Sequence, residues 1–173
     1  MNRDIVLAEL ENVREKMLDV VNNRIDDLIN RIESGEPFDG DDTPVETVFP
    51  LSAAPSYFKG TKPTAVFFGD EKTAVKTWFN VYTLILQRCA EDQKKREAFL
   101  YLCNKIMGRK RVILSDKPDG MNRPAEVTEG VYAEGFFDTE WLIRILTTQL
   151  LDNVRYDYSD ISVSVTTLKK RRY

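Results

Sequence analysis

Residues 64–78 read Thr64-Ala65-Val66-Phe67-Phe68-Gly69-Asp70-Glu71-Lys72-Thr73-Ala74-Val75-Lys76-Thr77-Trp78. Two apolar runs, 64–68 and 73–76, flank a short polar stretch that contains a glycine, and this pattern is typical of a strand, a tight turn and a second strand. Thr77 suits the N-cap of a helix that begins at Trp78. The stretch therefore predicts a β-hairpin that leads directly into a helix.

Similar patterns continue toward the C-terminus. Two features mark the last part of the chain. The region 140–154 is the most hydrophobic predicted helix, with Trp141 among its apolar residues, and 161–165 alternates as a strand does. The resulting order, ββααββαβ, predicts an α+β domain in which helices cover one side of a mostly antiparallel or mixed sheet. The predicted helices are 78–90, 93–107 and 140–154, and the predicted strands are 64–68, 73–76, 112–114, 131–137 and 161–165.

The organisation of the whole chain follows from composition. Residues 1–34 are predicted as a long amphipathic helix, 35–62 as an acidic linker that contains proline and glycine, 63–166 as the α+β body and 167–173 as a basic tail. Residues 1–62 carry a net charge of −6 (7 Lys/Arg, 13 Asp/Glu), whereas residues 63–173 carry +3 (18 Lys/Arg, 15 Asp/Glu). An acidic arm and a basic body can meet different partners.

The N-terminal segment has an apolar repeat with spacings of three and four residues. This spacing is closer to an eleven-residue than to a seven-residue period, so any supercoil should be weak or slightly right-handed. Such a helix can pack on its own domain, pair with a second copy to form a homodimer, or bind another protein. The candidate contact residues on this helix are Leu10, Val13, Met17, Val21, Ile25 and Leu28.

The absence of certain residue types excludes several chemistries. The sequence of 173 residues has no histidine, which removes Ser-His-Asp and Cys-His catalysis and every His-ligated metal site. Its two cysteines, Cys89 and Cys103, lie in apolar stretches and read as buried free thiols, which suggests a reducing cytoplasm. No phosphate-binding glycine loop occurs, and no apolar run approaches the roughly 18 residues of a membrane span. We therefore expect a cytoplasmic, non-enzymatic protein with no cofactor and no metal site.

A basic segment is the strongest candidate for a working surface. The window 105–123 holds six basic and two acidic residues and spans a predicted helix end, a strand and a polar loop. Arginine forks in such a cluster suit phosphate groups or guanine edges. The alternatives are cations that merely complement a helix dipole, and a surface for an acidic protein partner. The candidate binding residues are Lys105, Arg109, Lys110, Arg111, Lys117 and Arg123.

One carboxylate accompanies this basic segment. Glu134 follows Tyr132 at strand spacing, so both side chains face the same side. They could line a polar groove with Arg109 or Arg111; alternatively, Tyr132 packs and Glu134 pairs with an arginine. Pro118-Asp119 followed by Glu134 resembles the start of a metal-dependent nuclease motif, but Phe136 stands where such a motif needs lysine.

Residues 62–165 also carry a resemblance. Lys62-Pro63, the hairpin leading into Thr77-Trp78, and Gly108-Arg109-Lys110-Arg111 resemble an uncharacterised module of bacterial mobile-element proteins, which also occurs C-terminally on restriction-type proteins. The resemblance continues through Ser115, Pro118, Met121, Pro124, Gly130-Val131-Tyr132-Ala133-Glu134 and Tyr156-Asp157-Tyr158-Ser159-Asp160-Ile161.

This resemblance implies work on or near DNA-handling systems in a bacterial host cell. The expected function is a non-enzymatic protein of a phage or other mobile element that binds nucleic acid, or a nucleic-acid-bound protein, through the basic segment. Two alternatives stay open. The protein could inhibit host defence in the manner of an anti-CRISPR protein, by holding a nuclease–guide RNA complex and blocking DNA engagement, or it could be an accessory subunit of a restriction system.

Overall fold

The structure is a computed structural model that describes residues 46–167 together with six separate positions near the N-terminus. The chain divides into two compact units, Met1–Thr43 and Pro44–Tyr173, and the fold below is that of the second unit. The predicted long helix, the acidic stretch 35–45 and the basic tail therefore lie outside the described residues, apart from those six positions. The six are helical and exposed: Glu11, Arg14, Leu18, Val21, Asn22 and Ile25.

The second unit is an α+β structure whose paired strands are all antiparallel within the described residues. A four-stranded sheet has the order β1-β7-β2-β3, and a three-stranded sheet has the order β4-β6-β5. The strands are β1 (Glu46–Pro50), β2 (Thr61–Phe68), β3 (Glu71–Ala74), β4 (Leu114–Ser115), β5 (Pro124–Thr128), β6 (Val131–Glu134) and β7 (Ile161–Thr167). The helices are α2 (Trp78–Ala90), α3 (Gln93–Leu102) and α4 (Thr139–Arg144), which a π-helical segment (Ile145–Leu151) prolongs.

The hairpin and helix predicted from residues 64–78 are present. β2 pairs with β3 from Ala65 opposite Ala74 to Phe68 opposite Glu71, and Gly69 makes the turn with a φ of +59°, which glycine adopts without strain. The Thr77 side chain accepts a hydrogen bond from the backbone N–H of Asn80, as an N-cap does. The predicted hairpin and helix are therefore confirmed, although β3 covers Glu71–Ala74 in place of the predicted 73–76, because the turn is shorter than expected.

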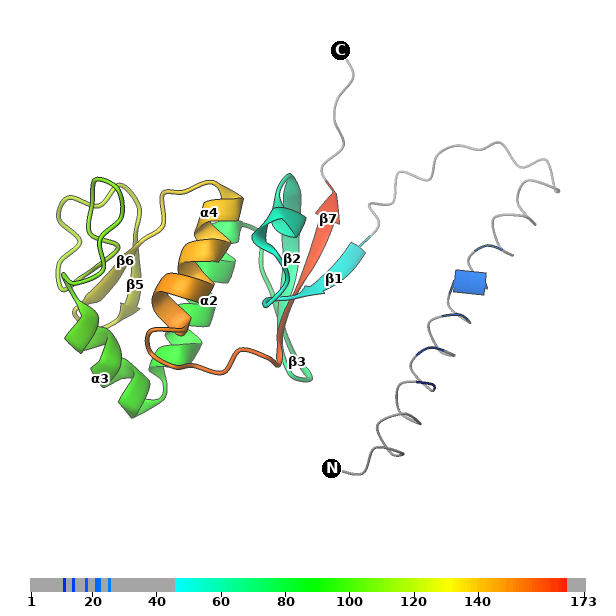
Figure 1. Cartoon of the computed structure of the whole chain (residues 1–173), viewed down its shortest axis with the longest axis horizontal. Helices are drawn as coiled ribbons and strands as arrows, with labels where there is room; N and C mark the ends of the chain where they lie inside the picture. The colour runs from blue at the N-terminus through cyan, green and yellow to red at the C-terminus, as the bar shows by residue number, and fades with distance from the viewer. Residues whose placement is uncertain are drawn as a thin grey trace, which may run out of the picture. The chain divides into compact units, whose positions relative to one another are not determined.

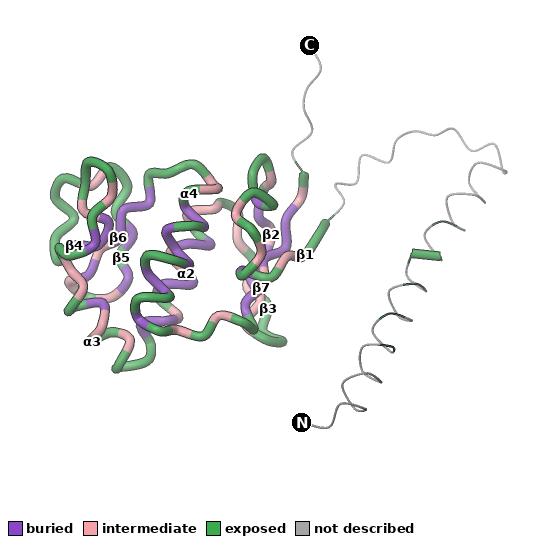
Figure 2. The backbone as a smooth tube through the Cα atoms, in the orientation of Figure 1, coloured by how far each residue is buried: buried purple, intermediate pink, exposed green. Residues whose placement is uncertain are grey.

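The helices lie between two sheets, whereas the sequence predicted helices on one side of a single sheet. α2 contacts β2 of the larger sheet and β5 of the smaller one, and Figure 1 shows α2 and α4 as the central layer. Buried residues continue through all three layers, as Figure 2 shows. The physical reason is that α2 buries more than one narrow stripe, so it can cover a sheet on each side.

Residues 46–62, which composition assigned to the linker, belong to the body. β1 is an edge strand that pairs with β7, and the Leu51 N–H donates to the Ile161 carbonyl. The side chains of Leu51 and Phe58 are 0% exposed. The prolines that suggested a linker occupy positions that tolerate them, because Pro50 ends an edge strand and Pro55 begins a 3-10 turn.

Other elements also differ from prediction: the strand predicted at 112–114 is Leu114–Ser115, and the strand predicted at 131–137 ends at Glu134. α3 ends at Leu102, not near residue 107, because Asn104 adopts a left-handed φ of +63° that breaks the helix. Strand β5 was not predicted, since its alternation is short and begins with a proline. The predicted helix 140–154 is α-helical only to Arg144. Beyond it, backbone hydrogen bonds such as that from the Asp152 N–H to the Thr147 carbonyl join residues five positions apart, which is the π-helical pattern.

Both cysteines are free thiols, as predicted, but only one of them is buried. Cys89 is buried in α2, and burial raises its pKa to about 12. Cys103 is half-buried at the end of α3, where burial also raises its pKa. Within the part of the chain that the structure describes, no helix is both long enough and apolar enough to cross a membrane.

Candidate functional site

The basic segment forms the tip of a small hairpin, which we call the basic hairpin (residues 106–113). The Ile113 N–H donates to the Ile106 carbonyl at 2.9 Å, and the Gly108 N–H donates to the Arg111 carbonyl at 2.7 Å. An isolated antiparallel bridge joins Met107 to Val112 between these two bonds. Arg109 and Lys110 therefore form the turn itself, and both are exposed; the sequence placed them between a helix end and a strand.

Buried side chains hold the base of the basic hairpin. Ile106 and Ile113 are 7% and 4% exposed, so both anchor the two arms in the core. Asn104 directs the chain into the hairpin through its left-handed backbone, and its N–H donates to the Leu114 carbonyl at 2.7 Å. The Asn104 side-chain amide also donates to Asp116 at 3.0 Å, and this bond holds the pKa of that carboxyl below its usual range. The turn is therefore held in position by the core packing and hydrogen bonds at the base of the basic hairpin.

Glu134 ties the basic hairpin to β6. Its carboxylate is only 2% exposed and accepts hydrogen bonds from the backbone N–H groups of Asn122 (2.7 Å), Arg123 (3.0 Å) and Phe136 (2.9 Å). The Arg111 guanidinium lies 3.9 Å from the same carboxylate. The predicted pairing of Glu134 with an arginine is confirmed, and both carboxylate oxygens are committed to positioning backbone and arginine.

The six predicted basic residues divide into two groups. Arg109, Lys110 and Arg111 come together at the hairpin, and each lines at least one of the hollows described below. The other three lie outside those hollows. Lys105 rests on the Tyr101 ring at 3.2 Å from its centroid, Arg123 lies 4.0 Å from the Phe79 ring centroid, and the Lys117 N–H donates to Ser115 Oγ.

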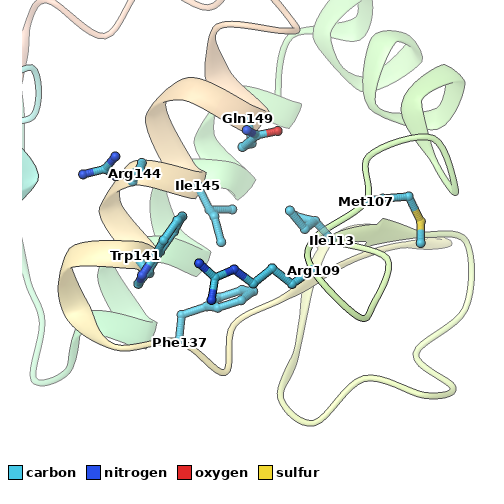
Figure 3. A pocket seen from close by; sticks show the side chains of 9 residues that line it. Met107, Arg109, Ile113, Phe137, Trp141, Arg144, Ile145 and Gln149 are labelled. Carbon is cyan, nitrogen blue, oxygen red and sulfur yellow. The ribbon is translucent and has the colours of Figure 1, made fainter.

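Three hollows surround the basic hairpin. The Trp141 hollow (about 480 Å³) lies between the hairpin and α4, and Figure 3 shows the side chains that line it. The Glu134 hollow (about 290 Å³) lies between the hairpin and the segment after β6, and the Met121 hollow (about 380 Å³) lies toward the 119–121 loop. A projecting cationic turn is therefore bordered by concave surface.

Exposed aromatic side chains accompany these cations, and sequence reasoning missed them. Trp141, one of the apolar residues of the predicted helix 140–154, is 46% exposed, while Leu142 and Ile143 beside it take the buried positions of α4. Phe136 and Phe137 are 63% and 36% exposed. The available signal was the aromatic pair directly before the helix cap Asp138, where a strand-like run ends and its side chains no longer alternate into a core.

Arginines flank Trp141. The guanidinium of Arg109, from the basic hairpin, lies 6.0 Å from the ring centroid, and that of Arg144, one turn further along α4, lies 5.3 Å from it. Within the described residues, no ion pair involves Arg109 or Lys110, whereas Arg144 pairs with Glu140 at 3.7 Å. Cation–aromatic surfaces of this kind suit planar or anionic ligands.

The remaining candidate residues stand apart from this site. Of the predicted contact residues on the N-terminal helix, only Val21 and Ile25 are described; both are helical and exposed, and the others lie outside the described residues. Among the described residues, no group of three or more Cys, Asp or Glu side chains is arranged to hold a metal ion. The homodimer or partner helix therefore stays a prediction.

Comparison with known proteins identifies no relative. No family model matches the chain, and neither a curated protein nor a solved structure matches it. Inferences about function therefore depend on the geometry and charge of the site itself.

Proposed function

We propose that this protein binds nucleic acid, without catalysing a reaction on it, through the basic hairpin. The observation that carries the proposal is the position of Arg109 and Lys110 at the tip of a turn whose base is fixed by buried Ile106 and Ile113. A projecting pair of cations can approach a phosphate backbone, and each contact releases counterions.

The surroundings of the turn support nucleic acid over a simple helix-dipole role. Helix-dipole cations belong to the last turn of a helix, but Arg109 and Lys110 lie well beyond the end of α3 at Leu102. Exposed aromatic side chains beside the turn, including Trp141 and Phe136, add the ring surfaces on which bases stack in nucleic-acid-binding proteins.

Arg111 has a different role in this proposal. Its guanidinium faces the buried carboxylate of Glu134, so part of its charge is already balanced within the protein. A reversal to glutamate at this position would bring two carboxylates together and would disturb the hairpin itself. A test of binding therefore uses Arg109 and Lys110 and leaves Arg111 unchanged.

The experiment measures binding of labelled double-stranded and single-stranded DNA at several salt concentrations. We expect affinity to fall steeply with salt, and the double variant Arg109→Glu/Lys110→Glu to bind much more weakly, with the slope of log K against log salt reduced by about 2. The matched control is Lys76→Glu/Lys94→Glu, which makes the same charge change at exposed positions that line none of the three hollows.

Two results would contradict the proposal. One is equal loss of binding in the control, which would mean that net charge and not the hairpin matters. The other is no binding by the wild type at low salt, which would turn attention to a nucleic-acid-bound protein, including a CRISPR or restriction nuclease. The mobile-element setting of the protein rests on the sequence resemblance alone.

A further inference from the structure

The Trp141 hollow combines an aromatic wall with a polar end. Trp141 and Phe137 form one side, and Figure 3 shows the Arg109 side chain directed from the basic hairpin toward both rings. Ile145 and Ile113 contribute apolar surface between helix and hairpin. The hollow measures about 480 Å³, which is within the range of sites that hold small molecules.

The π-helical segment shapes this hollow. Ile145 begins the segment and Gln149 lies within it, and both line the hollow. The hydroxyls of Thr147 and Thr148 donate to the carbonyls of Ile143 and Arg144, which fixes the altered helical path. π-helical segments inside helices are rare and are found frequently at functional sites.

The charged residues that line the hollow are all basic. None of its nine lining residues is acidic, and Arg109 and Arg144 come from two different elements. Arg144 also pairs with Glu140 at 3.7 Å, so Arg109 is the lining cation that no ion pair within the described residues balances. Within the described residues, the Gln149 side-chain amide has no hydrogen-bond partner, and the residue is exposed. A ligand that fits this arrangement has a flat face, a hydrogen-bonding edge and adjacent negative charge.

We propose that the Trp141 hollow binds an unstacked nucleobase of single-stranded nucleic acid, with the base face on Trp141 and the neighbouring phosphates at Arg109 and Arg144. This inference rests on the proposed function and deepens it. A base inside a duplex is stacked on both faces and cannot present one to Trp141, whereas a base of a single strand can. The distance from the Arg109 guanidinium to the Trp141 ring centroid, 6.0 Å, is at the outer limit for a cation–π interaction, and Trp141 is 46% exposed.

Charge complementarity separates this ligand from an apolar peptide. An apolar peptide could also pack against the aromatic wall. However, Arg109 makes no ion pair within the described residues, and an apolar peptide would not supply an anion for it. A nucleotide can stack its base on the Trp141 ring and place its phosphate at Arg109, because the base and the phosphate are linked through one sugar. The geometry does not distinguish deoxyribose from ribose, so the test uses both a DNA strand and an RNA strand.

The experiment compares a dT12 oligonucleotide, an rU12 oligonucleotide and an abasic 12-mer with the same phosphates, using the full chain. Binding is followed by anisotropy of the labelled strand and by intrinsic tryptophan fluorescence. The chain has two tryptophans, and Trp78 is half-buried with its indole N–H donating to the Thr61 carbonyl at 2.9 Å, so quenching reports mainly on exposed Trp141. We expect dT12 or rU12 to bind about tenfold more tightly than the abasic strand and to quench the emission.

The variant Trp141→Ala should remove both the quenching and the roughly tenfold advantage of strands that carry bases, while the abasic strand binds as before. The matched control is Tyr57→Ala, an exposed aromatic residue in the 3-10 turn of the larger sheet, which should bind like the wild type. Thermal melting of both variants confirms that each is folded. The strand that binds more tightly, dT12 or rU12, identifies the sugar.

Several results would overturn the inference. Equal binding of the abasic strand and dT12, or unchanged affinity in Trp141→Ala, would remove the base site while leaving nucleic-acid binding through the hairpin intact. Equal loss of binding in Tyr57→Ala would show that the effect is not local to the hollow. Failure of all single strands to bind, while double-stranded DNA still binds, would overturn the base site alone. Failure of single-stranded and double-stranded DNA alike would overturn the proposed function, and the base site with it.

Discussion

Arg111 Nη1 lies 3.9 Å from Glu134 Oε2, so the basic hairpin is joined to β6 by a charge pair whose acidic partner is buried. The same carboxylate accepts three backbone N–H groups from the 122–123 loop and from Phe136. One buried side chain thus positions the hairpin, the loop before β5 and the aromatic pair after β6. This arrangement explains how three short segments can present one continuous surface.

Replacement of Glu134 by glutamine should destabilise the protein by about 1–3 kcal/mol, because the introduced amide cannot accept all three backbone N–H groups. Chemical denaturation measures the change, and hydrogen exchange should rise at Asn122 and Arg123. The control is Glu126→Gln on neighbouring β5, where the exposed carboxylate has no such contacts. Equal stability of the two variants would contradict the anchoring role.

Gly135 is required for steric reasons. A Cβ at this position would lie 2.5 and 2.7 Å from two atoms of the Phe79 ring and 3.1 Å from the Arg123 carbonyl. Gly135→Ala should therefore cost about 1–3 kcal/mol, and the cost should shrink in a Phe79→Ala background, where the ring is absent. Denaturation of the two single variants and the double variant measures the coupling. Additive effects would show that the ring is not what excludes the methyl group.

The segment 46–62 should be essential for folding. A chain that begins at Pro44 should melt as a folded domain, whereas a chain that begins at Pro63 lacks β1, Leu51 and Phe58 and should not fold. Phe58→Ala alone should cost about 3–5 kcal/mol, because the side chain is fully buried and packs on Phe49 and Trp78. Circular dichroism and thermal melting of each chain provide the measurement. A cooperative transition in the shorter chain would contradict this boundary.

The hydrogen bond from Asn104 should control the titration of Asp116. Because that bond lowers the pKa of Asp116 in the folded state, the stabilisation is present above the ordinary value near 3.9 and is lost as the pH falls through the lowered pKa. Asn104→Gly tolerates the left-handed backbone but removes the donor, so the pKa should rise toward its ordinary value. NMR titration of the carboxyl carbon measures it. Arg155→Gly, at φ +54°, is the control and should leave it unchanged.

The two thiols should differ in reactivity. At pH 8 the buried Cys89, with its pKa raised to about 12, is almost entirely protonated and shielded from reagents. Cys103 is only half-buried, so iodoacetamide should modify it before Cys89. Its modification should still be slow, because the pKa of Cys103 is also raised and little thiolate is present. Mass spectrometry of peptides after timed alkylation measures both. Modification of Cys89 before Cys103 in the folded protein would contradict the burial of α2.

Much of the local structure follows from the sequence. The hairpin at 64–76, the cap at Thr77 and the cap at Asp138 depend on side chains that act on their own backbone, so a single segment contains the needed information. The grouping of Arg109, Lys110 and Arg111 was also predictable, since the three are adjacent. Lys105, Lys117 and Arg123 were grouped with them only by proximity in sequence. The side chains of Lys105 and Arg123 each lie on an aromatic ring of their own, and none of the three lines a hollow around the basic hairpin.

The sequence by itself determined the α+β class, the antiparallel pairing of the first hairpin and the basic character of the 109–111 turn, because these depend on local periodicity and adjacent charge. Only the tertiary structure decided that helices lie between two sheets, that β1 joins the body and that Trp141 faces solvent. Those outcomes depend on which apolar surfaces meet across long separations, as Leu51 meets Ile161 and Glu134 meets the 122–123 loop. The residues adjacent in sequence cannot specify such long-range contacts, since the burial of each side chain depends on how all the layers pack together.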